Sequence, residues 1–351
     1  MTEENQTTHK RRVRYSGKYP KKFEEKYKEL QPEKYKDTIE HVIKKGNTPA
    51  GMHISIMVNE ILDFLKIQPG ETGFDATLGY GGHTKAMLQC LKGQGHIYAT
   101  DVDPEESART RKRLEEAGFG EDILTIRLQN FCTIDEIAKE AGGFDFILAD
   151  LGVSSMQIDN PKRGFSFKVD GPLDLRLNQE AGISAAERLA AITKDELAGM
   201  LYENSDEPYC EELAKAITDE IRKGNRIDTT TKLRNVIEKT LDFLPEKEKK
   251  DTIKKTCQRT FQALRIDVNR EFEVLYEFME KLPDALKPGG RAAILTFHSG
   301  EDKLVKKALK EGYRAGIYAD YAKDVIRPSA QECAQNGRAR STKMRWAIKA
   351  E

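Results

Sequence analysis

Cysteine is scarce in this 351-residue sequence, and the cysteines form no pattern. The five are odd in number, widely spaced and without a C-x-x-C pair; they are Cys90, Cys132, Cys210, Cys257 and Cys333. Such usage excludes a disulfide framework and a cysteine-based zinc site, and it is typical of a reducing compartment. We therefore expect a cytoplasmic protein without a bound metal.

Long apolar runs are also missing. No stretch approaches the ~20 residues that a membrane-spanning helix needs, and no apolar run of the kind that marks a secretory signal follows the N-terminus. Neither sign of charge is in excess, because 58 basic residues balance 58 acidic ones. The sequence predicts a soluble protein with no membrane partner, in which nucleic-acid contacts come from local basic patches.

One such patch lies near the N-terminus. Residues 10–23 contain seven lysines and arginines and no acid, interleaved with Tyr15, Tyr19 and Phe23. Basic and aromatic residues together neutralise phosphates and stack on unpaired bases. The same composition suits a solvated arm that orders only on binding. We treat residues 1–50 as a basic N-terminal extension.

Strand and helix patterns alternate after this extension. Short apolar segments at 72–78, 96–101, 123–127 and 144–150 read as strands, and helical patterns lie between them, at 84–91 and 104–117 among others. Short loops join them, which indicates a parallel sheet with right-handed crossovers. We expect residues 51–158 and 261–351 to form one α/β domain with a doubly wound, Rossmann-like sheet.

The alternation stops over residues 159–260. No strand pattern is evident there, and Ser184-x-x-Glu187 and Thr193-x-x-Glu196 have the form of helix capping boxes. We expect an inserted helical domain. The α/β pattern resumes with a helix over 261–282 and a strand over 292–297, and residues 344–348 suit a last, antiparallel edge strand.

Three predicted strand ends carry candidate ligand-binding residues. The first leads into a turn with glycines at 79, 81 and 82; the others end in Asp101 and Asp150. Ligands bind beyond the carboxyl ends of strands in such sheets, and Asp101 stands about where an acid holds ribose hydroxyls. Thr84 replaces the third glycine of a dinucleotide fingerprint, which favours S-adenosylmethionine over a nicotinamide. Many glycine-rich turns are merely connections.

Nine segments together have a more specific meaning. They are residues 53–60, 75–84, 101–104, 150–157, 163–167, 170–176, 259–266, 297–302 and 336–341. In these segments the sequence resembles the bacterial 16S rRNA cytosine-N4 methyltransferases, the MraW family, over nearly all of the chain from His53. It departs from the family pattern at Ala76, where glycine is usual, at Gly300, where leucine is usual, and in the basic extension.

The resemblance implies a cofactor, a substrate and a set of residues. S-adenosylmethionine would be the methyl donor, and 16S rRNA in the small ribosomal subunit the acceptor. The residues implied to bind the cofactor are Gly81, Gly82 and His83 at the methionine part, Asp101 at the ribose, Phe131 at the adenine, and Asp150 and Gln157 near the methyl group. A homodimer is left open.

Methyl transfer to a cytosine amine needs alignment and hydrogen-bond acceptors, because the amine lone pair is delocalised into the ring. We expect Asp150 to orient the amine, with the Ser154 hydroxyl as a further acceptor and His298 near the substrate opening. A strand-end carboxylate that caps local amides is the simpler interpretation of Asp150. No second histidine lies at metal-ligand spacing from His298, so we expect Ser299 to cap a helix there, supported by Asp302.

Several arginines suit RNA binding if they gather at one cleft, with the target base flipped into a pocket between the domains. They are Arg163, Arg176, Arg259, Arg265, Arg338 and Arg340. Any one of them alone is more often a surface ion-pair residue. Other interpretations are a methyltransferase for another RNA or a protein, a cofactor-binding ribosome assembly factor without turnover and, more distantly, a nicotinamide oxidoreductase.

Overall fold

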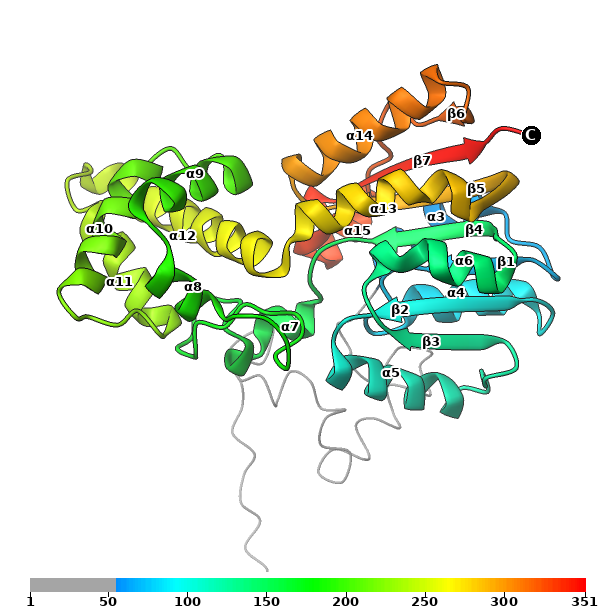
Figure 1. Cartoon of the computed structure of the whole chain (residues 1–351), viewed down its shortest axis with the longest axis horizontal. Helices are drawn as coiled ribbons and strands as arrows, with labels where there is room; N and C mark the ends of the chain where they lie inside the picture. The colour runs from blue at the N-terminus through cyan, green and yellow to red at the C-terminus, as the bar shows by residue number, and fades with distance from the viewer. Residues whose placement is uncertain (1–54) are drawn as a thin grey trace, which may run out of the picture. The chain divides into compact units, whose positions relative to one another are not determined.

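The computed structural model describes residues 55–351, which form a seven-stranded sheet and its helices (Figure 1). The strands lie in the order β3-β2-β1-β4-β5-β7-β6. Their bounds are β1 Thr72–Asp75, β2 His96–Asp101, β3 Leu124–Leu128, β4 Phe144–Asp150, β5 Leu286–Thr296, β6 Tyr318–Tyr321 and β7 Lys343–Lys349. The first five pair in parallel, and β7 pairs antiparallel with both β5 and β6. The predicted doubly wound α/β sheet is confirmed.

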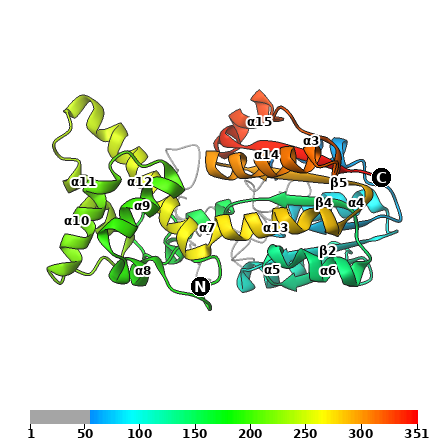
Figure 2. The same ribbon diagram turned by 45° about the horizontal axis from the view of Figure 1, so that its top comes forward.

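Two layers of helices cover the sheet because its strands are apolar on both faces. In β4, Ile147 and Ala149 point to one face, and Phe146 and Leu148 to the other. The first face packs against α6, α13 and α14, of which α6 and α13 lie side by side (Figure 2). The second packs against α3, α4 and α5. The bounds of these helices are α3 Val58–Leu65, α4 Gly82–Leu91, α5 Pro104–Glu116, α6 Ile134–Ala141, α13 Glu271–Ala285 and α14 Ser299–Arg314.

A third apolar core belongs to the helical segment between β4 and β5. It runs from Phe165 to Leu264 and holds residues such as Leu201, Leu213 and Ile237. The elements there are α7 Ser155–Asp159, η3 Pro161–Arg163, α8 Ala185–Ala191, α9 Lys194–Ser205, α10 Cys210–Arg222, α11 Thr230–Thr240 and α12 Glu246–Asn269. The expected boundary at residue 261 falls inside α12, whose later turns still pack in this core. The division into domains stays a prediction.

Two expectations about the last third are wrong. The helix expected over 261–282 is two helices, α12 and α13, separated at Arg270, which has the left-handed φ of 52°. Strand β7 is not at the edge, because β6 pairs along its outer side. The short elements α15 Ala330–Gln335 and η4 Gly337–Ser341 complete the described chain, with η2 Phe131–Thr133 earlier. No helix within residues 55–351 is long and apolar enough to cross a membrane. The basic extension lies outside the described residues.

Candidate active site

The order in which the strands are added to the sheet reverses between β1 and β4. The candidate residues lie at this switch point. Asp75 ends β1, Asp101 ends β2 and Asp150 ends β4, so the carboxyl ends of three adjacent parallel strands bear carboxylates. A doubly wound sheet opens its crevice at such a switch point because the helices on either side diverge. The predicted placement of Asp101 and Asp150 at the carboxyl ends of parallel strands is confirmed.

The glycine turn after β1 leaves room at one residue only. Among residues 55–351, a Cβ at Gly79 would come no closer than 3.8 Å to another atom, the carbonyl oxygen of Thr77. A Cβ at Gly81, whose φ is 82°, would lie 2.6 Å from Thr110, and one at Gly82 would lie 2.0 Å from the Ser55 hydroxyl. Close packing within the protein therefore explains the last two glycines, and the described part of the chain leaves space beside Gly79. Contact of Gly81 and Gly82 with a cofactor stays a prediction.

Asp101 is held rigidly beside this open space. Its Oδ2 accepts the N–H of Gly79 at 2.8 Å, and its Oδ1 accepts the N–H of Asp103 at 2.9 Å. Burial raises the pKa of Asp101 to about 6, and the neighbouring Asp103 charge adds to the rise. Each oxygen retains a lone pair for a hydroxyl donor. The arrangement suits the ribose role predicted for Asp101.

Asp150 and His83 face each other across the switch point. The imidazole Nδ1 of His83 lies 3.4 Å from Asp150 Oδ2, and its Nε2 lies 2.9 Å from the carbonyl oxygen of Ile56. The backbone N–H of Asp150 donates to the hydroxyl of Thr77 at 2.7 Å. Asp150 Oδ1 is buried and has no hydrogen-bond partner among residues 55–351, although the side chain as a whole remains 27% exposed. Asp150 thus has acceptor capacity that the protein does not use.

The His83 ring presents one nitrogen to a backbone carbonyl and the other to the Asp150 carboxylate. A carbonyl only accepts, so His83 Nε2 must carry a hydrogen to bond Ile56. In the neutral ring Nδ1 is then an acceptor, and a hydrogen bond to Asp150 requires one proton between the two groups. Burial raises the pKa of Asp150 to about 6, while the His83 charge opposes the rise. The carboxyl of Asp150 can therefore take up and release a proton near pH 6.

Ser154 and Gln157 lie at the start of α7 and form a capping box. The Ser154 hydroxyl accepts the N–H of Gln157 at 3.1 Å, and Gln157 Oε1 accepts the N–H of Ser154 at 2.9 Å. Gln157 Nε2 donates to Asp103 Oδ2 at 2.9 Å. Both side chains are therefore fixed by protein contacts, and the Ser154 hydroxyl still has a hydrogen to donate. Their roles towards cofactor and substrate stay predictions.

His298 follows β5, next to the end of β4, and caps α14. Its Nδ1 accepts the N–H of Glu301 at 3.5 Å, and the Glu301 carboxylate accepts the N–H of Phe297 at 2.8 Å. The expectation that Ser299 caps this helix is wrong: Ser299 is the first helical residue. Gly300 has a physical reason, since a Cβ there would lie 2.5 Å from the ring of Phe272. That ring meets the His298 ring edge-on at 5.7 Å.

The surroundings of His298 include the one group of side chains within residues 55–351 that is close enough to hold a metal ion. Ligand atoms of Glu271, His298 and Glu301 lie within 4.8 Å of one another. However, Arg265 already forks onto both oxygens of Glu271 at 2.8 Å, and this guanidinium supplies the positive charge that two carboxylates require. The absence of a metal stays a prediction, as does the catalytic role of His298.

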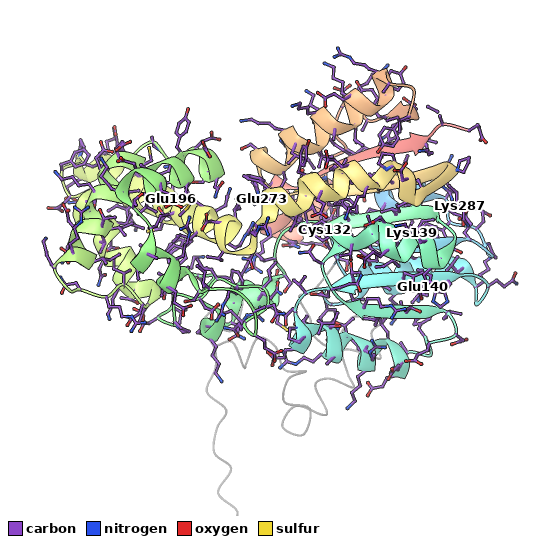
Figure 3. The ribbon with its side chains drawn as sticks, viewed as in Figure 1. Cys132, Lys139, Glu140, Glu196, Glu273 and Lys287 are labelled. Carbon is purple, nitrogen blue, oxygen red and sulfur yellow. The ribbon has the colours of Figure 1, made fainter. Side chains whose placement is uncertain are left out.

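Phe131 and Cys132 lie beside α13 on one face of the sheet, and Cys257 lies in the helical core. Phe131 meets Phe278 edge-on at 5.2 Å and is half-buried. Its role at the adenine stays a prediction. Cys132 follows it beside α13 (Figure 3), and its carbonyl accepts the ammonium of Lys281 at 2.8 Å. Cys257 is buried in the helical core, and burial raises the pKa of its thiol to about 12. Neither thiol is poised as a nucleophile.

Most of the arginines proposed for RNA are engaged within the protein. Their partners are Asp103 for Arg163, Asp174 for Arg176, Glu207 for Arg259, Glu271 for Arg265 and Asp159 for Arg338. Arg340 is exposed and forms no ion pair with another residue of 55–351. The arginines are therefore mainly structural, and Arg340 is the better candidate for a phosphate contact.

Two residues of the site were missed in the sequence. Thr77 orients the backbone of Asp150, and nothing in its surroundings distinguishes it from a strand residue. Asp103 joins Asp101, Gln157 and Arg163. A signal for Asp103 was present, because an aspartate before Pro104 is typical of a helix N-cap, and the side chain does accept the N–H of Glu106.

The fold and the site define a class: a doubly wound α/β protein that has a glycine turn and two strand-end acids at the switch point of its sheet, where such folds bind ligands. Comparison with known proteins gives the family. The sequence model of the MraW methylase family matches residues 50–350 of this chain. This chain belongs to the MraW methylase family.

Relatives match over almost their whole length. The chain is 86% identical to ribosomal RNA small subunit methyltransferase H 1 of Agathobacter rectalis over 351 residues, covering 100% of both chains. It is 70% identical to the protein of the same name from Lachnoclostridium phytofermentans, covering 99% of this chain and 95% of that one. It is 36% identical to ribosomal RNA small subunit methyltransferase H of Koribacter versatilis, covering 85% and 94%.

Proposed function

We propose that this protein transfers a methyl group from S-adenosylmethionine to the exocyclic N4 amine of a cytosine in the 16S rRNA of the small ribosomal subunit. Family membership supports methyl transfer, and the names of relatives that are 64–86% identical support the small-subunit rRNA. The position of Asp150 at the switch point, with acceptor capacity left unused, is the observation that carries the proposal.

The residues present fit such a cofactor. Open space adjoins Gly79, and Asp101 beside it retains lone pairs for ribose hydroxyls. Asp150 ends β4, two strands away from the end of β2 at Asp101, and His83 lies beside Asp150. We assign Asp101 to the ribose, Phe131 to the adenine side, and Gly81, Gly82, His83 and Gln157 to the remaining cofactor-binding set. When bound, S-adenosylmethionine supplies an electrophilic methyl group on a sulfonium.

Asp150 then has to prepare the amine. An ionised carboxylate accepts an N–H bond from the cytosine amine, which fixes its orientation and draws its lone pair out of the ring. As the new C–N bond forms and the methyl–sulfur bond breaks, the electron pair stays on sulfur and the nitrogen becomes acidic. The ionised carboxylate of Asp150, whose pKa burial raises to about 6, then receives the proton that the amine releases. Ser154 and His298 are proposed to border the cytosine.

The test is the product itself. Small subunits from cells lacking the modification should acquire N4-methylcytosine when incubated with the protein and S-adenosylmethionine, as detected by mass spectrometry of nuclease digests. Methylation of a different base, or of ribosomal protein alone, would refute the substrate assignment. Tight binding without any transfer would favour an assembly factor. Cytoplasmic localisation and a homodimer stay predictions; light scattering of the purified protein tests the latter.

A further inference from the structure

Arg163 is the last residue of η3, near the start of the helical segment, and its side chain points inward. Only 6% of the side chain is exposed. One terminal nitrogen donates to Asp103 Oδ2 at 2.7 Å, and the other donates to the carbonyl oxygens of Arg176 and Leu177 at 3.1 and 2.6 Å. Nε has no acceptor among residues 55–351. The guanidinium therefore bridges the α/β part of the chain and the loop after η3, and a phosphate would have to displace these bonds.

Asp103 connects this guanidinium to the acid assigned to the ribose. Its backbone N–H donates to Asp101 Oδ1 at 2.9 Å, and its Oδ2 accepts both Arg163 and Gln157. Asp103 is 2% exposed, so its charge depends on these donors for stability. The Asp103 charge also raises the pKa of Asp101. Arg163 thus pairs with the carboxylate whose charge opposes the ionisation of Asp101.

The other end of the bridge is tied to α12. The N–H of Leu177, whose carbonyl accepts Arg163, donates to Asn269 Oδ1 at 2.8 Å. Asn269 Nδ2 donates to the carbonyl of Leu175 at 2.8 Å, and Asn269 is the last residue of α12. A continuous series of charged and amide hydrogen bonds therefore runs from Asp101 through Asp103 and Arg163 to the point where α12 meets α13.

We propose that Arg163 is a positioning residue that couples cofactor binding at Asp101 to the placement of the helical segment, so that the protein with bound cofactor binds the ribosomal subunit more tightly. The inference rests on the proposed function, because it takes the cofactor and the subunit as ligands. A ribose that bonds Asp101 acts on the same backbone turn that carries Asp103. Binding at one site then changes binding at the other by a common factor, and the effect is reciprocal.

The experiment measures this factor directly. The dissociation constant for small subunits lacking the modification is determined by filter binding, with and without saturating S-adenosylhomocysteine, which allows no turnover. In the wild type the ratio of the two constants should be about fivefold or more, the lower end of typical coupling. Arg163→Lys keeps a cation beside Asp103 but lacks the second terminal nitrogen, which in arginine bonds the two carbonyls. Its ratio should fall to within about twofold of one.

Two further variants make the result specific. Asn269→Ala cuts the series at its far end, away from the cofactor, and should lower the ratio equally; it decides the matter if Arg163→Lys does not fold. Arg345→Lys is the matched control, because Arg345 is also buried and bonds Asp302 at 2.7 Å and the carbonyl of Ala322 at 3.3 Å. Its ratio should equal that of the wild type.

The outcomes separate the two proposals. A wild type that methylates subunits but has a ratio of one overturns the coupling and leaves the proposed function standing. The same holds if Arg163→Lys and Asn269→Ala both keep the wild-type ratio. A wild type that binds neither S-adenosylhomocysteine nor subunits overturns the proposed function, and the coupling falls with it.

Discussion

His83 Nδ1 lies 3.4 Å from Asp150 Oδ2, while the opposite nitrogen of the same ring lies 2.9 Å from a backbone carbonyl. The carbonyl fixes which ring nitrogen carries a hydrogen, so the other nitrogen faces the Asp150 carboxylate. This relationship connects the turn after β1 to the end of β4. With the role proposed for Asp150, we expect the reaction to depend on pH.

The pH dependence follows from the pKa of Asp150, which burial raises to about 6 and which the charge of His83 lowers in part. Because the ionised carboxylate accepts the amine, kcat/KM should rise with pH through about 6. His83→Gln removes the opposing charge, so its midpoint should move to higher pH. Rates of methyl transfer to subunits between pH 5 and 9 measure both curves. Identical midpoints in the two proteins would show that His83 does not act on Asp150.

The ionised carboxylate of Asp150 should also destabilise the protein when no ligand is bound. A carboxyl whose pKa is raised by folding from 3.8 to about 6 favours the folded state most when it is protonated. That contribution is complete below pH 3.8 and is lost as the pH rises through about 6. Asp150→Asn should therefore be more stable than the wild type by about 3 kcal/mol at pH 8 and equal to it near pH 3. Urea unfolding at the two pH values is the measurement, and equal stability at both would contradict the assignment.

The Phe272 ring should require a glycine at position 300. Gly300→Ala would place a Cβ 2.5 Å from the Phe272 ring and should destabilise the protein by about 1–3 kcal/mol. In a Phe272→Ala background the collision is gone, and the same change should stabilise by up to about 1 kcal/mol, since alanine favours a helix more than glycine does. A double-mutant cycle of thermal unfolding measures the difference. Additive effects would mean that the two residues are independent.

Arg259 should act on stability and Arg340 on RNA binding. Arg259 is the ion-pair partner of Glu207, which is fully buried, at 2.7 Å. Arg259→Ala should cost about 3–5 kcal/mol, because it leaves a buried charge without its cation. Arg340→Ala should leave stability unchanged and weaken subunit binding, more so at low salt. Chemical denaturation and filter binding test the two variants side by side, and the reverse result would contradict their assignment.

The sequence predicts the parts of this site that depend on strand ends. Asp101 and Asp150 follow apolar strands, and parallel topology brings such ends to one edge whatever the side-chain details. It does not predict the partners of Arg163 and Arg259, because these ion pairs join residues 60 and 52 positions apart. An arginine that faces inward has the same sequence signature as one that binds RNA.

The two wrong predictions about the fold have similar causes. The break at Arg270 has no glycine or proline to mark it; α12 ends where Asn269 bonds the loop at Leu175 and Leu177. Strand β6 has only four residues and an exposed middle, so no alternation reveals it. Both features are fixed by tertiary contacts, and local pattern does not contain them.

The most direct test of the account is a single-turnover measurement with wild type and Asp150→Asn. Subunits lacking the modification are mixed with excess enzyme and S-adenosylmethionine carrying a radioactive methyl group, and calorimetry first establishes that both proteins bind the cofactor. Asparagine keeps the shape but cannot become an anion, so the rate of label transfer to 16S rRNA should fall by at least about 100-fold. Equal rates in two proteins of equal cofactor affinity would contradict the central role of Asp150.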